Sequence, residues 1–368
     1  MLIICSKNEL LKSVGIVSKA VSTRTTMPIL EDILLDAEGK TLTLTGNDMD
    51  MGIKTTIEAV VKEEGTICVN AKMFSEMIRR LPDEDVKLKT EENGRMTIDC
   101  GRSTFTIGTM NGEDFPQLPT IESKQEIMVS QSILREMISD TIFSVAPENS
   151  GRPVLTGELM DIRDGYLYLV AVDGFRISMR RTPVQCQENF KVTVPAKALS
   201  EINKILESEE DSLVTVCFTG KHALFKMNNT EVVTRTLEGT FLNYERNLDI
   251  EFKSKVTINR KDLLDAVDRA ALISRESKNS PIRLDIEEDK VVITSNAETG
   301  TSHEEVSLKL EGEGLAIAFN PKYYLEALKA IDDTDIVIKY ASSLTPCIIE
   351  NPDSKDYQYF ILPIRMHN

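Results

Sequence analysis

Tryptophan is absent from this chain of 368 residues, aromatic residues make up 5% of it, and histidine occurs three times. The histidines stand alone at positions 222, 303 and 367, so a histidine metal site or a nucleophile triad lacks its parts. Neither a GxxxxGKS/T nor a GxGxxG phosphate-binding motif is present. We therefore expect a protein with no catalytic residues, no cofactor and no metal.

The chain also lacks CxxC pairs and long apolar runs. Its six cysteines mostly lie in apolar stretches, where a free cysteine behaves as a small buried hydrophobe. No run approaches the ~20 apolar residues of a membrane span, and no basic stretch precedes the apolar residues at the N-terminus, as a secretory signal requires. These absences predict a cytoplasmic protein with reduced thiols and no membrane partner.

Two neighbouring carboxylates, Asp48 and Asp50, would share one face of an extended strand. A hard cation needs several converging oxygens, so a distant carboxylate would have to join them. An acidic strand end is the interpretation that we favour.

A threefold internal repeat is the strongest pattern in the sequence. Three segments align: VNAKMFSEMIRRL (69–81), VPAKALSEINKIL (194–206) and FNPKYYLEALKAI (319–331). Each combines a strand end, a turn, a lysine and an amphipathic helix, and the lysine recurs at intervals of 125 residues. Equal spacing of this length indicates a repeated domain rather than a short solenoid unit.

A second set of helices precedes the first set within each copy. Apolar residues recur at helical spacing over 7–21, 131–143 and 260–273. Short β-rich runs separated by turn pairs such as Asp164-Gly165 favour hairpins and hence antiparallel sheet. These runs lie at 41–45, 85–90, 165–172, 213–218, 290–295 and 335–340.

Two helices over an antiparallel sheet make a two-layer α+β domain. We therefore predict three tandem two-layer domains, covering residues 1–120, 126–247 and 250–368. The first boundary falls within EDFPQLPTIESKQ (113–125), whose prolines and polar tail are typical of a linker, and the second lies near 241–249.

The net charge of −16 argues against nucleic acid as a partner unless the basic residues are concentrated. The six predicted helices together carry +5, which leaves −21 on the strands and loops. If the helices face a common centre, their lysine and arginine side chains can make nonspecific contacts with DNA phosphates there. Ordinary solvated helix faces remain the alternative. The candidate DNA-facing residues on these helices are Lys72, Arg79, Arg80, Lys197, Lys204, Lys322 and Lys329.

Over essentially its full length the chain resembles the bacterial DNA polymerase III beta subunit family, the replicative sliding clamps. The resemblance rests on the repeat and on four segments in this order: TMPILEDILLDAEGKTLTLTGNDMDMGI (26–53), EDFPQLP (113–119), AVDGFRIS (171–178) and ILPIRM (361–366). It implies the DNA clamp fold and a head-to-tail homodimeric ring that encircles double-stranded DNA and confers processivity. The implied partners are the DNA polymerase III alpha-type subunit, the clamp loader and repair proteins that carry a clamp-binding motif.

The resemblance also places a dimer interface, at Phe105 and Ile107 against Leu272 and Ile273 of a second copy. Phe105 and Ile107 lie in a strand bounded by glycines, and an edge strand can pair across chains. Both could equally be plain core residues of an alternating strand.

A peptide pocket between the second and third domains is implied by the same resemblance. Pro363 cannot continue a central strand because it lacks an amide hydrogen, so the chain must leave the sheet there. A tight turn at 173–174 and a final core strand are the alternatives for two of the segments. The matching residues are Leu155, Val172, Gly174, Phe175, Arg176, Ile177, Leu242, Arg246, Leu344, Pro346, Phe360, Ile361, Leu362, Pro363, Ile364, Arg365 and Met366.

Three positions depart from the family's commonest pattern: Phe175 replaces a frequent histidine, Val172 a threonine and Leu242 a proline. These differences leave the preferred peptide motif open. Arg24 and Asn149 match loop positions that touch DNA in the family. A repeat scaffold that binds only protein partners remains the alternative function if the basic helix faces play no part.

Overall fold

The computed structural model describes residues 1–22, 24–122, 125–186, 188–209, 211–247, 250–276 and 280–366, without the side chains of 246–247 and 275–276. Its contacts divide the chain into two compact units. Unit 1 comprises Met1–Gln131 and Lys204–Thr236, and unit 2 comprises Ser132–Asn203 and Leu237–Asn368. No helix in the described ranges is long and apolar enough to cross a membrane.

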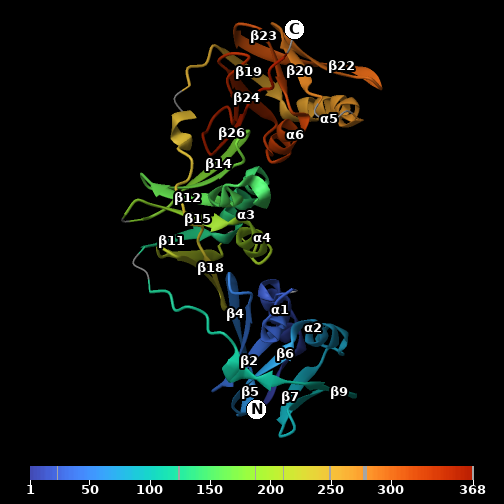
Figure 1. Cartoon of the computed structure of the whole chain (residues 1–368), viewed down its shortest axis with the longest axis vertical. Coiled ribbons are helices and arrows are strands. Elements are labelled where there is room, and N and C mark those ends of the chain that lie inside the picture. The colour runs from blue at the N-terminus through green and yellow to red at the C-terminus, as the bar shows by residue number, and fades with distance from the viewer. Residues whose placement is uncertain are drawn as a thin grey trace. The chain divides into compact units, whose positions relative to one another are not determined.

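Unit 1 contains two antiparallel sheets, of nine strands (β10-β6-β2-β3-β4-β18-β17-β16-β11) and five strands (β5-β1-β7-β8-β9), with helices α1 and α2 in contact (Figure 1). The helices are α1 (Lys7–Val17) and α2 (Ala71–Arg80), with 3-10 helices η1 (Ser18–Ala20), η2 (Pro28–Glu31) and η3 (Gly112–Asp114). The strands are β1 (Leu2–Ser6), β2 (Asp32–Glu38), β3 (Thr41–Asn47), β4 (Met51–Glu58), β5 (Val60–Glu63), β6 (Gly65–Asn70), β7 (Asp85–Glu91), β8 (Arg95–Cys100), β9 (Ser103–Gly108), β10 (Met110–Asn111), β11 (Gln125–Ser130), β16 (Leu213–Phe218), β17 (His222–Met227) and β18 (Thr230–Arg235).

Unit 2 contains a twelve-stranded sheet in the order β15-β12-β13-β14-β26-β25-β24-β19-β22-β21-β20-β23. Its helices are α3 (Gln131–Ser139), α4 (Ala196–Asn203), α5 (Arg260–Glu276) and α6 (Pro321–Lys329), with 3-10 helices η4 (Ile142–Ser144), η5 (Glu148–Ser150), η6 (Pro153–Thr156) and η7 (Tyr244–Asn247). The strands are β12 (Gly157–Arg163), β13 (Tyr166–Val172), β14 (Arg176–Pro183), β15 (Phe190–Pro195), β19 (Ser254–Asn259), β20 (Ile282–Ile286), β21 (Lys290–Ala297), β22 (Gly300–Gly312), β23 (Leu315–Phe319), β24 (Asp335–Tyr340), β25 (Cys347–Glu350) and β26 (Tyr357–Ile361).

All six predicted helices are confirmed, and their ends follow local chemistry. The side chain of Asn70 accepts a hydrogen bond from the amide of Met73 (3.2 Å) and caps the start of α2. Asn320 caps α6 in the same way, through the amide of Lys322 (3.0 Å), and Pro321 takes the first helical position, where its missing N–H costs nothing. The repeated Asn-or-Pro turn before these two helices is therefore a helix start signal.

The predicted antiparallel sheet is also confirmed, but the strands of the first and second copies each divide between two sheets rather than one. The first copy contributes the runs β1-β7-β8-β9 and β6-β2-β3-β4. The second contributes β11-β16-β17-β18 to unit 1 and β15-β12-β13-β14 to unit 2. Because its two runs continue the sheets of the other copies, the middle copy is split by the compact units, and the predicted domain boundaries remain a prediction.

Successive copies are joined by one kind of strand pairing. At what we call the first junction, β4 pairs antiparallel with β18, and Thr55 stands opposite Thr230. At the second junction, β14 pairs antiparallel with β26, and Arg180 stands opposite Tyr357. In the first copy, β9 is the counterpart of β18 and β26, and in the third copy, residues 300–307 of β22 are the counterpart of β4 and β14. Within the described chain, neither of these two edges has a second strand paired with it.

The core of unit 2 contains a carboxyl group without full hydrogen bonding. Glu158 of β12 is fully buried, and its Oε2 lies 2.9 Å from the hydroxyl of Thr141. That hydroxyl also lies 2.7 Å from the carbonyl of Met137, and its single hydrogen serves only one of the two acceptors. Burial raises the pKa of Glu158 to about 8. A protonated Glu158 can donate to Thr141 and leave the Thr141 hydrogen for Met137.

We predict that Glu158→Gln removes a pH dependence of stability. The folded pKa lies above the unfolded value of 4.5, so the contribution of Glu158 is full below pH 4.5 and is lost as the pH rises to about 8. The midpoint of thermal unfolding, measured from pH 5 to pH 9, should fall more steeply in the wild type than in the variant. The exposed Glu148→Gln is the control, and equal slopes in all three proteins would contradict the assignment.

Candidate functional site

A cavity of about 960 Å³ in unit 2 brings together part of the predicted peptide pocket. Several of its apolar side chains are open to solvent: Phe175 is 58% exposed, Leu344 64% and Leu362 40%. Exposed apolar groups gathered at one cavity mark a binding site for an apolar ligand. The predicted residues that line it are Phe175, Leu344, Leu362, Pro363, Ile364 and Arg365.

The hairpin tip between β13 and β14 positions Phe175. The Oδ1 of Asp173 accepts the amides of Phe175 (2.8 Å) and Arg176 (3.1 Å), and Gly174 has a φ of 93°. A residue with a side chain rarely adopts such an angle, so glycine suits the turn. The expected tight turn is therefore present, and it holds the Phe175 ring stacked on Tyr323, with centroids 6.0 Å apart and planes 18° apart.

Arg176, another predicted pocket residue, is buried and is not among the residues that line the cavity. Its Nε donates to Asp173 Oδ2 (3.0 Å), and its other nitrogens donate to the Glu326 carboxylate and the carbonyl of Phe143. The guanidinium also lies 4.5 Å from the Tyr323 ring centroid. Arg176 thus fixes the hairpin tip that carries Phe175 against α6.

Charge around the cavity is mainly basic. Lys322, Lys329 and Arg365 are exposed at its rim, whereas Glu326, the carboxylate among the lining residues, is paired with Arg176. Burial and the Asp173 carboxylate raise the pKa of Tyr323, which keeps this lining phenol neutral. The cavity therefore suits an apolar segment with acidic or neutral neighbours. The predicted DNA-facing Lys322 and Lys329 lie at this cavity.

Other predicted pocket residues lie in the adjacent core or outside the cavity. Leu155, Val172, Ile177 and Phe360 are buried in one cluster with Tyr244, and Ile361 is buried as well. Leu242 and Met366 are 42% and 40% exposed, Gly174 is exposed and Pro346 is half-buried. The side chain of Arg246 lies outside the described residues. The final core strand, offered as an alternative for 361–366, is correct only up to Ile361, where β26 ends before Pro363.

Several lining residues were not predicted. They are Ala271, Ser274, Ser280, Asn320, Pro321, Tyr323, Leu325 and Glu326. Tyr323 had a detectable signal, since it is an aromatic residue beside the repeated lysine of α6, where the other copies have Met73 and Ala198. The approach of α5 to α6 had no signal in the sequence.

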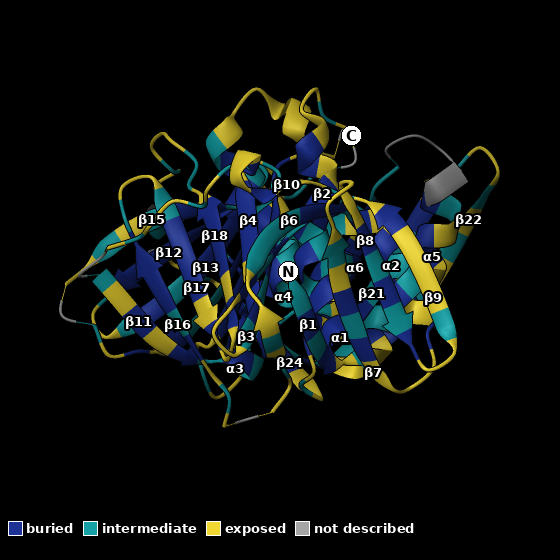
Figure 2. Cartoon of the chain, turned by 90° about the horizontal axis from the view of Figure 1, so that it is seen from below, coloured by how far each residue is buried: buried dark blue, intermediate teal, exposed yellow. Residues whose placement is uncertain are grey.

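The residues predicted for self-association lie on the edge strand β9 and on helix α5, which packs against β22. β9 ends the five-stranded sheet, with Phe105 37% exposed and Ile107 5% exposed, and Figure 2 shows β9 as a mainly exposed strand. In unit 2, α5 packs against β22, where Leu272 is 57% exposed and the side chain of Ile273 lies over Gly300. Ile107 is thus a core residue as well as an edge residue.

The remaining predicted DNA-facing positions are all exposed. Arg79 and Arg80, in the last turn of α2, both form ion pairs with Glu76, at 2.6 and 3.0 Å. Such exposed pairs contribute little stability, so a phosphate can replace the carboxylate at low cost. The other exposed positions are Lys72, Lys197, Lys204, Arg24 and Asn149.

No group of three or more histidine, cysteine or acidic side chains arranged for a metal occurs within the described residues. The carboxylate of Asp48 instead accepts the amides of Asp50 (3.1 Å) and Met51 (2.8 Å), as expected for a strand end. Five cysteines are buried and free, and Cys186 is half-buried.

Comparisons with known proteins agree along the whole chain. Family models of the DNA polymerase III beta subunit match as N-terminal domain at 1–119, central domain at 128–243 and C-terminal domain at 246–365. The beta sliding clamp of Halalkalibacterium halodurans is 34% identical and that of Staphylococcus epidermidis 35%, over 99% and 95% of each chain.

Solved structures give the same result. A putative DNA polymerase III beta subunit from Eubacterium rectale is 39% identical with a TM-score of 0.95, and the DNA polymerase sliding clamp from Bacillus subtilis is 30% identical with a TM-score of 0.96. Both alignments cover 100% of each chain. This chain therefore belongs to the DNA polymerase III beta subunit family, the beta sliding clamps.

Proposed function

We propose that this chain is a cytoplasmic replicative sliding clamp with no catalytic activity of its own. Two copies close head to tail around double-stranded DNA and hold the polymerase on it. The cavity beside the second junction takes peptide motifs of the DNA polymerase III alpha-type subunit, the clamp loader and repair proteins. The observation that carries the proposal is the strand pairing repeated at both junctions. It leaves β9 in the first copy and residues 300–307 of β22 in the third copy as edges that can pair with a second chain.

The two observed junctions supply a register for the closing one. Thr230 and Tyr357 are the first residues of β18 and β26, and they stand opposite Thr55 and Arg180. In the first copy, Thr41 at the start of β3 pairs with Glu58 of β4, and Thr55 lies three residues before Glu58. In the second copy, Tyr166 at the start of β13 pairs with Pro183 of β14, and Arg180 lies three residues before Pro183. In the third copy, Lys290 at the start of β21 pairs with Ser307 of β22, so the equivalent residue is Glu304, three residues before Ser307. Ser103, the first residue of β9, should therefore stand opposite Glu304 of a second copy.

This register also satisfies burial and charge. It pairs Phe105 with Ser302 and Ile107 with Gly300, so the inward faces of both strands coincide, with Ile107 buried and Ser302 half-buried. The outward Thr106 meets the outward Thr301, and Arg102 meets Glu305, an opposite-charge pair that favours antiparallel pairing. The exposed Leu272 on α5 supplies apolar surface for Phe105.

We predict that a Thr106→Cys, Thr301→Cys chain forms a disulfide-linked dimer. Directly opposed residues have Cβ atoms about 4.5–5.5 Å apart, close to the separation that a disulfide needs. Non-reducing electrophoresis after mild oxidation, with Cys186→Ser in all chains, measures the linked fraction.

The matched control is Thr104→Cys with Thr301→Cys, which the register places two residues out of step and which should link poorly. Phe105→Arg should give a monomer by light scattering, because a charge replaces the apolar contact. Equal cross-linking of both cysteine pairs, or a monomeric wild type, would remove the proposed closure.

We predict that the protein, loaded onto a nicked circular DNA by its clamp loader, stays on the circle and leaves after the circle is cut. Phosphate contacts by exposed lysines and arginines weaken steeply as salt rises, so only ring closure retains the protein at high salt. Gel filtration at ~0.5 M salt, where charge contacts with phosphate are screened, measures retention before and after linearisation. Retention on linear DNA would contradict topological binding, whereas no retention on the circle would favour a scaffold that binds only proteins.

We predict that ending the chain after Ile361 abolishes binding of a clamp-binding peptide without opening the dimer. The lost segment supplies Leu362–Arg365 to the cavity, and it is anchored by the amides of Leu362 and Ile364 to the carbonyls of Phe175 and Ala318 (2.9 and 2.8 Å). Leu344→Ala, which leaves this segment in place, should weaken binding by about tenfold, or ~1.4 kcal/mol. Fluorescence anisotropy gives the affinity, and unchanged affinity in both variants would refute the pocket.

A further inference from the structure

The first junction repeats the hairpin tip that positions Phe175 at the second. Asp48 accepts the two following amides of its turn, as Asp173 does, and Met49 adopts a φ of 76° where the second tip has Gly174. The amide of Arg235 then donates to the carbonyl of Asp50 (2.9 Å), the counterpart of the bond from Leu362 to Phe175. The backbone that builds one side of the peptide cavity is therefore present twice in the chain.

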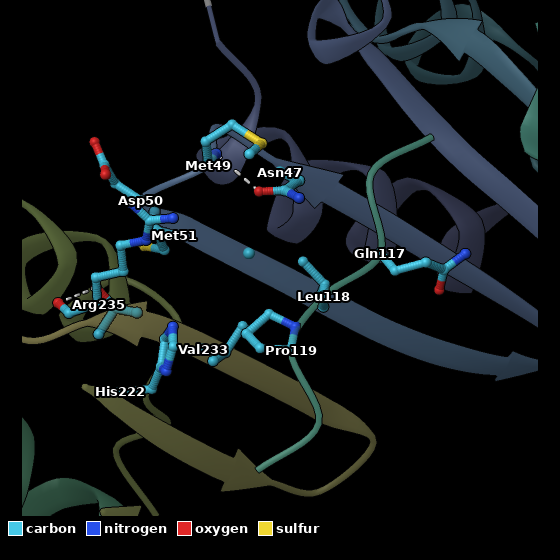
Figure 3. Close-up of a pocket in the computed structure, with 12 residues that line it drawn as sticks. Asn47, Met49, Asp50, Met51, Gln117, Leu118, Pro119, His222, Val233 and Arg235 are labelled. Atoms are coloured by element: carbon cyan, nitrogen blue, oxygen red, sulfur yellow. Dashed lines mark hydrogen bonds between the residues drawn. The ribbon is translucent and has the colours of Figure 1, made fainter. Parts of the chain in front are cut away.

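A segment of the chain itself covers the first junction. We call residues 116–121 the strap; it crosses β4 and β18, and Figure 3 shows Leu118 and Pro119 above these strands. A Cβ atom at Gly52 would lie only 2.2 Å from Leu118 Cδ2, so Leu118 occupies the space that a side chain at position 52 would take. The second junction has Ile177 at the same register position.

The strap is held mainly by two apolar side chains. Leu118 and Ile121 pack against a buried cluster of Cys217, Leu224 and Val233 on β16–β18. One side-chain bond, from Asn47 Nδ2 to the carbonyl of Pro116 (3.2 Å), fixes its beginning. An extended segment bound through apolar groups three residues apart is a peptide in a groove, supplied by the same chain.

The strap does not fill its groove. A cavity of about 300 Å³ remains beside it, bordered by Met49, Met51, Leu118 and Val233 on the apolar side. Burial and Arg235 lower the pKa of His222, so this histidine of the rim is neutral at physiological pH. This free volume adjoins Leu118 and offers space for a larger side chain at that position.

We propose that the first junction is a second peptide-binding groove, held closed by the strap. Its ligand is an extended peptide with apolar side chains three residues apart, as in Leu118 and Ile121, the first of them aromatic. A tethered segment competes at an effective concentration in the millimolar range, so an outside peptide must displace it. The strap keeps the number of open peptide sites at one per chain.

The test removes the strap's side chains and supplies the same segment from outside. A labelled peptide EDFPQFPTIE, which copies residues 113–122 with phenylalanine at the Leu118 position, is titrated into the wild type and into Leu118→Ala, Ile121→Ala. Anisotropy should show binding at least about tenfold tighter to the double variant, because the tethered competitor is gone. Leu118→Ala alone, which keeps Ile121, should show an intermediate gain.

Gly52→Val in the double variant is the matched control, since it fills the seat of Leu118 and should return the affinity to the wild-type level. All chains also carry Leu344→Asp, so that the cavity beside the second junction does not contribute to the measured binding. The result therefore tests the first junction alone, and the peptide site of the proposed function is tested separately. Circular dichroism confirms that each chain is folded. Equal affinity of the wild type and the strap variants overturns the proposal, as does tight binding that Gly52→Val leaves unchanged.

Discussion

The hydrogen-bonding groups at the edges of strands are the constraint on which this structure depends. A four-stranded run always ends in a row of unpaired amides and carbonyls, and such a row pairs with whatever strand it meets. Here β4 and β14 each receive the last strand of the next copy. Each of these edges is thereby satisfied by a strand of the next copy, so the middle copy is hydrogen-bonded to both of its neighbours.

The same constraint explains why compact units and sequence copies do not coincide. A boundary drawn from repeat spacing assumes that each copy packs chiefly with itself. Backbone pairing at the junctions instead links strands that are more than a hundred residues apart, such as Thr55 with Thr230, whose hydroxyls also form a buried hydrogen bond of 2.9 Å. Those contacts outweigh the connection between the two halves of the middle copy.

Local periodicity predicted the helices and hairpins because each depends on neighbours within a few residues. The repeated lysine marked the start of α6, and Asp164-Gly165 marked a real turn, where both residues have positive φ. The division of the first and second copies between two sheets was not predictable, since the pattern within one strand does not identify a distant partner strand. The contacts of Arg176 were not predictable for a similar reason, because its partner Glu326 lies 150 residues away along the chain.

Two hairpin tips, at 48–51 and 173–176, have nearly the same backbone structure but different surroundings. Each is built by an aspartate that accepts two amides and by a residue with positive φ. The position beneath each tip differs: Gly52 leaves space that Leu118 occupies on the strands, whereas Ile177 stands at that position at the second junction. The Phe175 tip is left open to solvent and stacks on Tyr323. A repeated fold thus supplies the geometry several times, and the side chains at each junction determine whether a partner can use it.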